Sequence, residues 1–164
     1  MSYETTLIFS EPLLRKAVFG FWRRSIGVSF LVALLVVTIS LGVLLVQSDA
    51  SWVTGVLATV LFFGVLFAAA LYFIHYRASL RKFRAMSNSQ AIFRAEESSF
   101  TIISSIGTVT YQWSTIKELW LFPQVWLLLF TPAQFSTLPV ECLPPEMQVY
   151  IIQRIRAAGG KVAG

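Results

Sequence analysis

The chain has 164 residues, 56% of them hydrophobic, with a formal net charge of +5 and a single cysteine, Cys142. One cysteine excludes an internal disulfide and suits a cytosolic location. The sequence holds no Cys/His metal-ligand spacing, no G-x-S-x-G and no glycine-rich phosphate loop, and its only histidine, His75, lies at the end of an apolar run. We therefore predict no enzyme activity, no catalytic residue and no cofactor or metal.

The first 24 residues are expected to form a short strand followed by an amphipathic helix. Leu7-Ile8-Phe9 is apolar, as a strand would be, and Ser10-Glu11-Pro12 has the capping residue and the proline that are typical of a helix start. From Leu13 onward, apolar residues recur on one helix face. This helix leads into the first apolar run, with a bend expected at Gly20 or Gly27.

Two uncharged apolar runs follow, at residues 25–48 and 50–76, with only Asp49 between them in a predicted turn. A bilayer core about 30 Å thick needs roughly 20 apolar residues in a helix. Membrane spans are therefore predicted at about residues 26–47 and 52–76, within a hairpin of residues 25–86. A cleavable signal peptide is the alternative for the first run, but such a peptide has a shorter apolar stretch closer to the start of the chain.

Lysine and arginine flank the two runs on one side only. The loop between the runs has none, whereas the flanking sequences carry eight, named here the basic collar: Arg15, Lys16, Arg23, Arg24, Arg77, Arg81, Lys82 and Arg84. Because such residues favour the cytoplasmic side, both termini are predicted to be cytoplasmic at the bacterial inner membrane, with the collar against anionic lipid headgroups. The rest of the chain is mildly acidic, which argues against nucleic-acid binding.

Small residues in the second run have two interpretations that the sequence leaves open. Gly64 and Ala68 have the spacing that lets two helices approach closely. They pack within the hairpin in the first interpretation, and they form a homo-oligomer interface in the second. The hydroxyls of Thr38 and Thr59 are expected to bond back to their own helices rather than to line a polar channel.

Residues 90–160 change to the period-two alternation of β-strands and are predicted to form a cytosolic domain. Strands are expected at residues 91–95, 100–104, 108–113, 116–122, 125–130 and 134–139, joined by short turns into an antiparallel meander. A helix begins at Pro144-Pro145 and stops at Gly159-Gly160. The predicted fold class is an α+β membrane protein, with a two-helix transmembrane hairpin and a small antiparallel β half-barrel capped by a C-terminal helix.

A family resemblance is carried by three segments, in this order: Trp113-Ser114-Thr115-Ile116-Lys117-Glu118, Leu127-Leu128-Leu129-Phe130 and Leu138-Pro139. With the two preceding spans and the final helix, the chain resembles the YcxB-like family of bacterial membrane proteins over most of its length. The resemblance implies a pleckstrin-homology-like (PH-like) cytosolic domain without enzyme activity. Cys142-Leu143-Pro144-Pro145 departs from the family, in which a more polar helix start is expected. Trp113 and Ile116 are expected to point into the domain core.

A dense apolar cluster lies in and around one predicted hairpin: Leu119, Trp120, Leu121, Phe122 and Trp126. Not all of these side chains can face one small core, so two interpretations stay open. Either they pack in the core and against the membrane or the helix at residues 14–21, or Leu119, Trp120, Phe122 and Trp126 form a surface for a partner or for lipid. We predict a non-enzymatic membrane protein that presents a cytosolic interaction domain to a membrane complex or another protein partner. The alternative is an immunity protein that neutralises a secreted antibacterial toxin.

Overall fold

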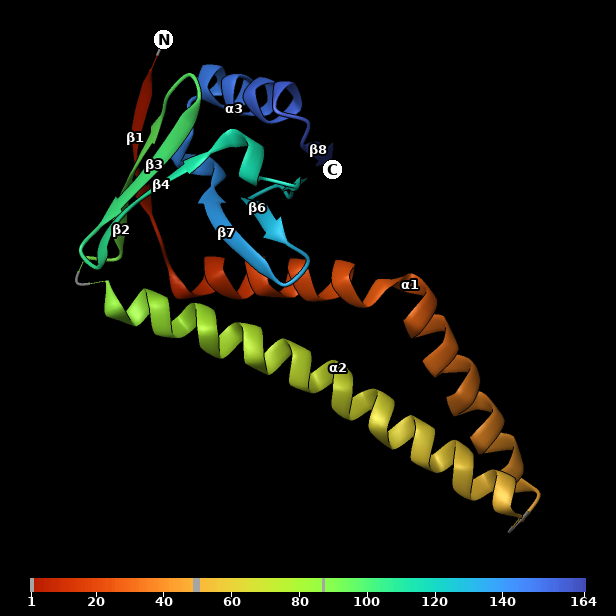
Figure 1. Cartoon of the computed structure of the whole chain (residues 1–164). Helices are drawn as coiled ribbons and strands as arrows, with labels where there is room; N and C mark the ends of the chain where they lie inside the picture. Colours follow the sequence, from red (N-terminus) through yellow and green to blue (C-terminus); the bar gives the residue numbers. More distant parts are fainter. Residues whose placement is uncertain (1, 49–50, 87) are drawn as a thin grey trace. The chain divides into compact units, whose positions relative to one another are not determined.

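The computed structural model describes residues 2–48, 51–86 and 88–164. The chain divides into two compact units. The first, called the domain here, consists of Met1–Val18 together with Tyr76–Gly164, and the second, called the helical hairpin, is Phe19–His75. The chain therefore leaves the domain near its start and returns to it after the hairpin, as the colours of Figure 1 allow the reader to follow.

Two long helices, α1 (Glu11–Val46) and α2 (Trp52–Ala85), occupy the two apolar runs. Gly27 interrupts α1 with φ 75° and ψ 156°, a conformation that glycine adopts readily because it has no Cβ. The predicted bend is thus confirmed at Gly27, whereas Gly20 lies in regular helix. Asp49, predicted to lie in the turn between the helices, falls outside the described residues.

The first sheet, sheet A, contains four antiparallel strands in the order β1-β2-β3-β4. Their bounds are β1 (Tyr3–Ile8), β2 (Gln90–Ala95), β3 (Ser99–Ser104) and β4 (Gly107–Gln112). Strand β1 precedes both long helices and β2 follows them, yet the two strands pair along their whole length, with Leu7 opposite Ala91. Sheet A is therefore assembled from both flanks of the helical hairpin (Figure 1).

One row of side chains crosses the outer face of sheet A. Glu4 lies opposite Arg94, Arg94 opposite Thr101, and Thr101 opposite Thr110. Arg94 Nε donates a 2.7 Å hydrogen bond to Glu4 Oε2, which raises the pKa of Arg94 above its ordinary value. The hydroxyls of Thr101 and Thr110 are 2.9 Å apart. Cross-strand polar pairs of this kind are typical of a sheet face that meets water.

The second sheet, sheet B, has the order β7-β6-β5-β8. Its strands are β5 (Glu118–Leu121), β6 (Val125–Thr131), β7 (Gln134–Pro139) and β8 (Lys161–Ala163). Strand β8 pairs with β5 in parallel, and the other pairs are antiparallel. Between β7 and β8 the chain forms the short 3-10 helix η2 (Val140–Cys142) and the helix α3 (Pro145–Ala157).

The core of the domain draws on both sheets and on α3. Its fully buried members come from each of these elements: Leu7, Phe93 and Phe100 from sheet A, Leu119, Leu128 and Leu138 from sheet B, and Met147, Ile151 and Ile155 from α3. The apolar residues of α3 recur at helical spacing, so that one stripe of this helix packs into the core. The domain is therefore an α+β fold in which β1 is a full member of the core.

The structure confirms the α+β class and places the strands within residues 90–139 close to the predicted positions. The expected strand at 116–122 is shorter, because Trp113–Thr115 forms the 3-10 helix η1 and regular pairing starts at Glu118. The strands form two separate four-stranded sheets, antiparallel except for the parallel pair of β5 and β8, and the described strands close no barrel. The half-barrel itself stays a prediction.

Residues 1–24 contain the predicted strand and helix, as β1 and the start of α1. Met1–Val18 belong to the same compact unit as Tyr76–Gly164. The fold continues past residue 160, because β8 follows α3 and pairs with β5. At Gly160 an added Cβ would lie 2.9 Å from the carbonyl O of Ile116, so glycine allows the close approach that brings β8 to the sheet.

Candidate functional site

The apolar surface of the helical hairpin is the first candidate site. Large side chains are exposed along both helices, among them Leu35 and Ile39 on α1 and Phe62 and Phe63 on α2, each about 60% exposed. Each helix contains an apolar stretch of 18 residues. None of that stretch is buried in α1 and 6% of it is buried in α2, whereas a core helix of a soluble protein buries most of such a stretch. Both helices are long and apolar enough to cross a membrane.

The two helices also pack against each other within the hairpin. A Cβ added to Gly64 would lie 2.7 Å from Leu34 Cδ1, and the rings of Phe30 and Phe67 have centroids 6.2 Å apart. Gly64 therefore lies where α2 meets α1, which favours the interpretation of packing within the hairpin. A Cβ on Gly55 would meet no atom within 4 Å.

The hydroxyl groups of Thr38 and Thr59 bond within their own helices, as the sequence predicts. Thr38 Oγ1 donates to the carbonyl O of Leu34, and Thr59 Oγ1 donates to the carbonyl O of Gly55, each at 2.8 Å. Such bonds satisfy a hydroxyl without a partner from another helix or from water.

Aromatic side chains connect α1 to α2 near residues 21–22 and 68–75, the parts of the hairpin that are closest in sequence to the domain. Trp22 Nε1 donates a 2.8 Å hydrogen bond to the carbonyl O of Ala68, and its ring lies edge-on to Tyr72. Phe21 is buried, and its ring centroid is 4.7 Å from that of His75. The structure therefore places the only histidine in a packing contact with a phenylalanine.

The basic collar is exposed at all eight positions. Two members, Arg23 and Arg24, belong to the helical hairpin and the other six to the domain. Within the domain, Arg15 lies 4.0 Å from Glu11, and Glu11 accepts a 2.9 Å hydrogen bond from the hydroxyl of Tyr76. This bond joins the first turn of α1 to the last part of α2, so that the two basic flanks of the hairpin approach each other inside one unit.

The predicted apolar interaction surface is largely buried, which corrects that interpretation. Leu119 is fully buried, and Trp120 and Trp126 are 7% and 6% exposed, whereas Leu121 and Phe122 are half-buried. Trp120 Nε1 donates a 2.7 Å hydrogen bond to Glu118 Oε2. These residues therefore form no exposed apolar patch.

The physical reason is that sheet B is covered on both faces. Trp126 and Leu128 of β6 belong to the core shared with sheet A and α3. Leu127 and Leu129 alternate with them, so they point to the opposite face, and they are buried as well. The sequence pattern of β6 is accordingly continuous rather than alternating, as for strands that are buried on both sides.

The start of α1 covers part of the face of sheet B that is opposite the shared core. Its residues Leu14, Ala17 and Val18 are buried, and Lys16 Nζ donates a hydrogen bond to Gln124 Oε1 beside the first residue of β6. In Figure 1 this part of α1 runs past β6 and β7. The first of the two predicted interpretations, packing in the core and against this helix, therefore agrees with the structure.

Trp113 and Ile116 occupy the core, as predicted. Trp113 is 2% exposed and Ile116 is 1% exposed. Trp113 Nε1 donates a 3.0 Å hydrogen bond to the carbonyl O of Glu96, and its ring packs against Phe100 with centroids 4.9 Å apart. Because η1 joins sheet A to sheet B, Trp113 fixes the point at which the chain passes from one sheet to the other.

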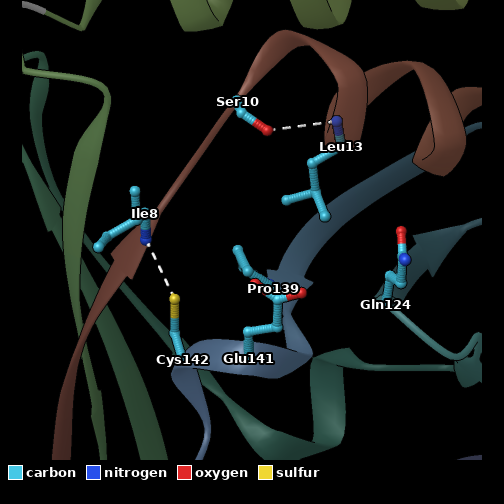
Figure 2. A pocket seen from close by; sticks show the side chains of 7 residues that line it. All are labelled: Ile8, Ser10, Leu13, Gln124, Pro139, Glu141 and Cys142. Carbon is cyan, nitrogen blue, oxygen red and sulfur yellow. Dashed lines mark hydrogen bonds between the residues drawn. The ribbon is translucent and has the colours of Figure 1, made fainter.

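A cavity of about 330 Å³ lies within the domain, where the end of β1, the start of α1 and the ends of β7 and η2 meet. Figure 2 shows the side chains that line it: Ile8, Ser10, Leu13, Gln124, Pro139, Glu141 and Cys142. Sequence reasoning missed this cavity, because no local pattern brings β1 to η2. The cavity mixes apolar and polar groups but holds no pair of side chains arranged for acid–base chemistry.

Cys142 connects η2 to β1 beside this cavity. Its Sγ accepts a hydrogen bond from the backbone N–H of Ile8 at 3.3 Å (Figure 2), and its carbonyl O accepts one from Thr5 Oγ1 at 2.6 Å. The thiol is half-buried. The unique cysteine is therefore in direct contact with the N-terminal strand β1.

Within residues 2–48, 51–86 and 88–164, no group of three or more His, Cys, Asp or Glu side chains could hold a metal ion. The chain matches no protein family, no curated protein and no solved structure.

Proposed function

We propose that the chain is a two-pass membrane protein whose helical hairpin anchors the α+β domain at the bilayer surface. The observation that carries this proposal is the exposure of large apolar side chains along both long helices. A bilayer removes this surface from water, at a gain of about 25 cal/mol per Å² of apolar area. In water the same surface would be an aggregation hazard.

The pairing of β1 with β2 supports a hairpin with both ends on one side. Ile8 lies opposite Gln90, and the backbone N–H of Phe9 donates a 2.9 Å hydrogen bond to the carbonyl O of Ser89. The chain thus enters and leaves the two long helices at neighbouring points of one sheet. Only an even number of membrane crossings is compatible with this pairing.

The basic collar supports the proposal that both ends of the hairpin lie on the cytoplasmic side of the membrane. All eight members are exposed, and basic residues in short flanking segments favour the cytoplasmic leaflet, where each is worth about 1 kcal/mol near anionic lipid. We therefore place both termini in the cytoplasm of a bacterium and the turn between the helices on the other side of the inner membrane.

The domain is proposed to serve as a non-enzymatic interaction module. This role is the one that the YcxB-like resemblance implies for a PH-like domain, and it is supported by a small domain in which two sheets share one core with a C-terminal helix. Because Leu119, Trp120 and Trp126 are buried, no partner is placed on them. The surface that remains for a partner includes the outer face of sheet A, where the polar row from Glu4 to Thr110 lies.

A cysteine-accessibility experiment tests the topology. In a Cys142→Ser background, Ser48→Cys and Thr108→Cys each supply one thiol at an exposed position, the first beside the turn and the second on β4. A membrane-impermeant maleimide added to intact spheroplasts should label Ser48→Cys and leave Thr108→Cys unlabelled until lysis. Labelling of Thr108→Cys from outside would overturn the orientation, and release of the native chain from membranes by alkaline carbonate would overturn the anchor.

A further inference from the structure

We infer that β1 couples the folding of the domain to correct insertion of the hairpin, because β1 can occupy its place in sheet A only when both ends of the hairpin lie on the same side of the membrane. This inference rests on the two-pass proposal and adds a consequence to it. The chain order supplies the coupling: β1 comes before the two long helices and its partner β2 comes after them.

The contacts of β1 show that the domain is incomplete without it. All six residues of β1 pair with β2, and Leu7 is fully buried in the core cluster that also contains Phe93. The ring of Tyr3 packs against Tyr150 of α3, with centroids 5.0 Å apart. Thr5 and Ile8 bond to Cys142 of η2. Strand β1 therefore touches sheet A, α3 and η2 at once.

Loss of β1 leaves specific defects in the rest of the domain. The edge of β2 would present its backbone N–H and C=O groups unpaired, and such an edge invites incorrect pairing. The place of Leu7 would become a cavity in the core. The carbonyl O of Cys142 would lose the hydroxyl of Thr5. A molecule with β1 on the wrong side of the membrane therefore keeps a domain that cannot close its core.

The inference predicts a parity rule for the number of spans. With two spans, or with none, β1 and the remainder of the domain are on the same side and can pair. With one span they are on opposite sides, whichever way that span is oriented. The rule depends on connectivity alone, so it does not require any particular sequence within the spans.

Three variants of the full chain test the rule. The one-span variant lacks residues 28–46, the second helical segment of α1. The no-span variant replaces residues 31–66 with a Gly–Ser linker of about ten residues between Phe30 and Phe67, whose rings are in contact. The control variant keeps two spans but replaces residues 28–46 with an equal number of leucines, so it separates the number of spans from their sequence.

The unique thiol of Cys142 supplies the measurement, since docked β1 lies against it. Maleimide labelling is followed in permeabilised cells, so that reagent reaches both sides, and for the one-span variant only the carbonate-resistant fraction is assayed. We expect slow labelling in the native chain, the no-span variant and the leucine control. In the one-span variant we expect labelling at least about tenfold faster, together with rapid proteolysis of residues 90–164, because the strand that stabilises this region is missing.

Addition of a peptide of residues 2–10 provides a second measurement on the one-span variant. In membranes opened on both sides, the peptide should slow labelling of Cys142 again, and the same peptide with Leu7→Asp should not. A one-span variant that is integrated in the membrane and still labels as slowly as the native chain would overturn the inference, and it would leave the two-pass proposal intact. A native chain that carbonate releases, with slow labelling in all variants, would overturn the two-pass proposal itself.

Discussion

The backbone N–H of Ile8 donates a hydrogen bond to the Sγ of Cys142 at 3.3 Å, across 134 positions of sequence. This contact joins β1, which lies before both long helices, to η2, which follows the last antiparallel strand of sheet B. It gives the chain a native reporter, because any change that releases β1 also uncovers its only thiol.

Leu7→Asp should destabilise the domain by about 3 kcal/mol or more, because it removes a fully buried side chain and places a carboxylate in an apolar site. Thr6→Asp is the matched control, since Thr6 is the preceding residue on the same strand and is exposed; its effect should stay within about 0.5 kcal/mol. The rate of Cys142 labelling across a urea series measures both. Equal effects of the two substitutions would contradict the burial of Leu7.

Gly64→Leu should separate the two helices of the hairpin, because even a Cβ at this position meets Leu34. Overpacking of this kind costs about 1–3 kcal/mol. Cross-linking of Phe30→Cys to Phe67→Cys by a short bis-maleimide, in a Cys142→Ser background, should fall sharply when Gly64→Leu is added. Gly55→Leu is the control, since no atom lies within 4 Å of its added Cβ.

The same pair of glycines distinguishes the two interpretations that the sequence leaves open. If Gly64 packs within the hairpin, Gly64→Leu leaves the oligomeric state in detergent unchanged and reduces only the cross-link within the chain. If it forms a homo-oligomer interface, the substitution converts an oligomer into a monomer. Size-exclusion chromatography with light scattering separates these results.

Trp113→Ala should cost about 3–5 kcal/mol of domain stability, as large truncations in a core do. Trp113→Phe keeps most of the ring but leaves the carbonyl O of Glu96 without its indole donor, so we expect a smaller loss of about 1–3 kcal/mol. The difference between the two variants, measured by urea denaturation of the detergent-solubilised protein, separates ring packing from the hydrogen bond. A Trp113→Ala variant as stable as the native chain would show that η1 is not fixed by this side chain.

Trp126→Glu should unfold the domain, because Trp126 is 6% exposed and belongs to the shared core. Ile106→Glu places the same charge at a position that is 53% exposed and should leave the domain folded. Proteolysis in membranes measures the outcome. If the Trp126→Glu variant stays folded and loses only the binding of a partner, Trp126 belongs to an interaction surface and its burial in the core is contradicted.

The parts of the fold that the sequence predicts are those that depend on local composition. The uncharged runs predict α1 and α2, because the length and polarity of a segment decide whether it suits a bilayer. Alternation predicts the strands within residues 90–139, and the proline pair predicts the start of α3 at Pro145. Gly27 was one of two predicted bends, since sequence alone does not give the φ of a glycine.

The parts that the sequence does not predict depend on contacts between distant residues. The start of β8 at Lys161 is visible only once its pairing with β5 is known. The burial of Trp120 requires knowledge that sheet B is covered on both faces. The cavity beside Cys142 requires β1 and η2 to meet. The inner-membrane location, the protein partner and the alternative of an immunity protein stay predictions.

The break at Gly27 bears on how the chain could adapt to its bilayer. Residues 28–46 form a helical segment about 28 Å long at 1.5 Å per residue, close to the thickness of a hydrocarbon core. Because Gly27 is outside helical geometry, no continuous helix transmits the tilt of this segment to residues 19–26. If the hairpin spans a bilayer as proposed, this segment and the part of α2 packed on it can change their tilt to match thicker or thinner membranes, with the break at Gly27 absorbing the change within α1. Substitution of Gly27 by alanine would remove that tolerance along with the bend.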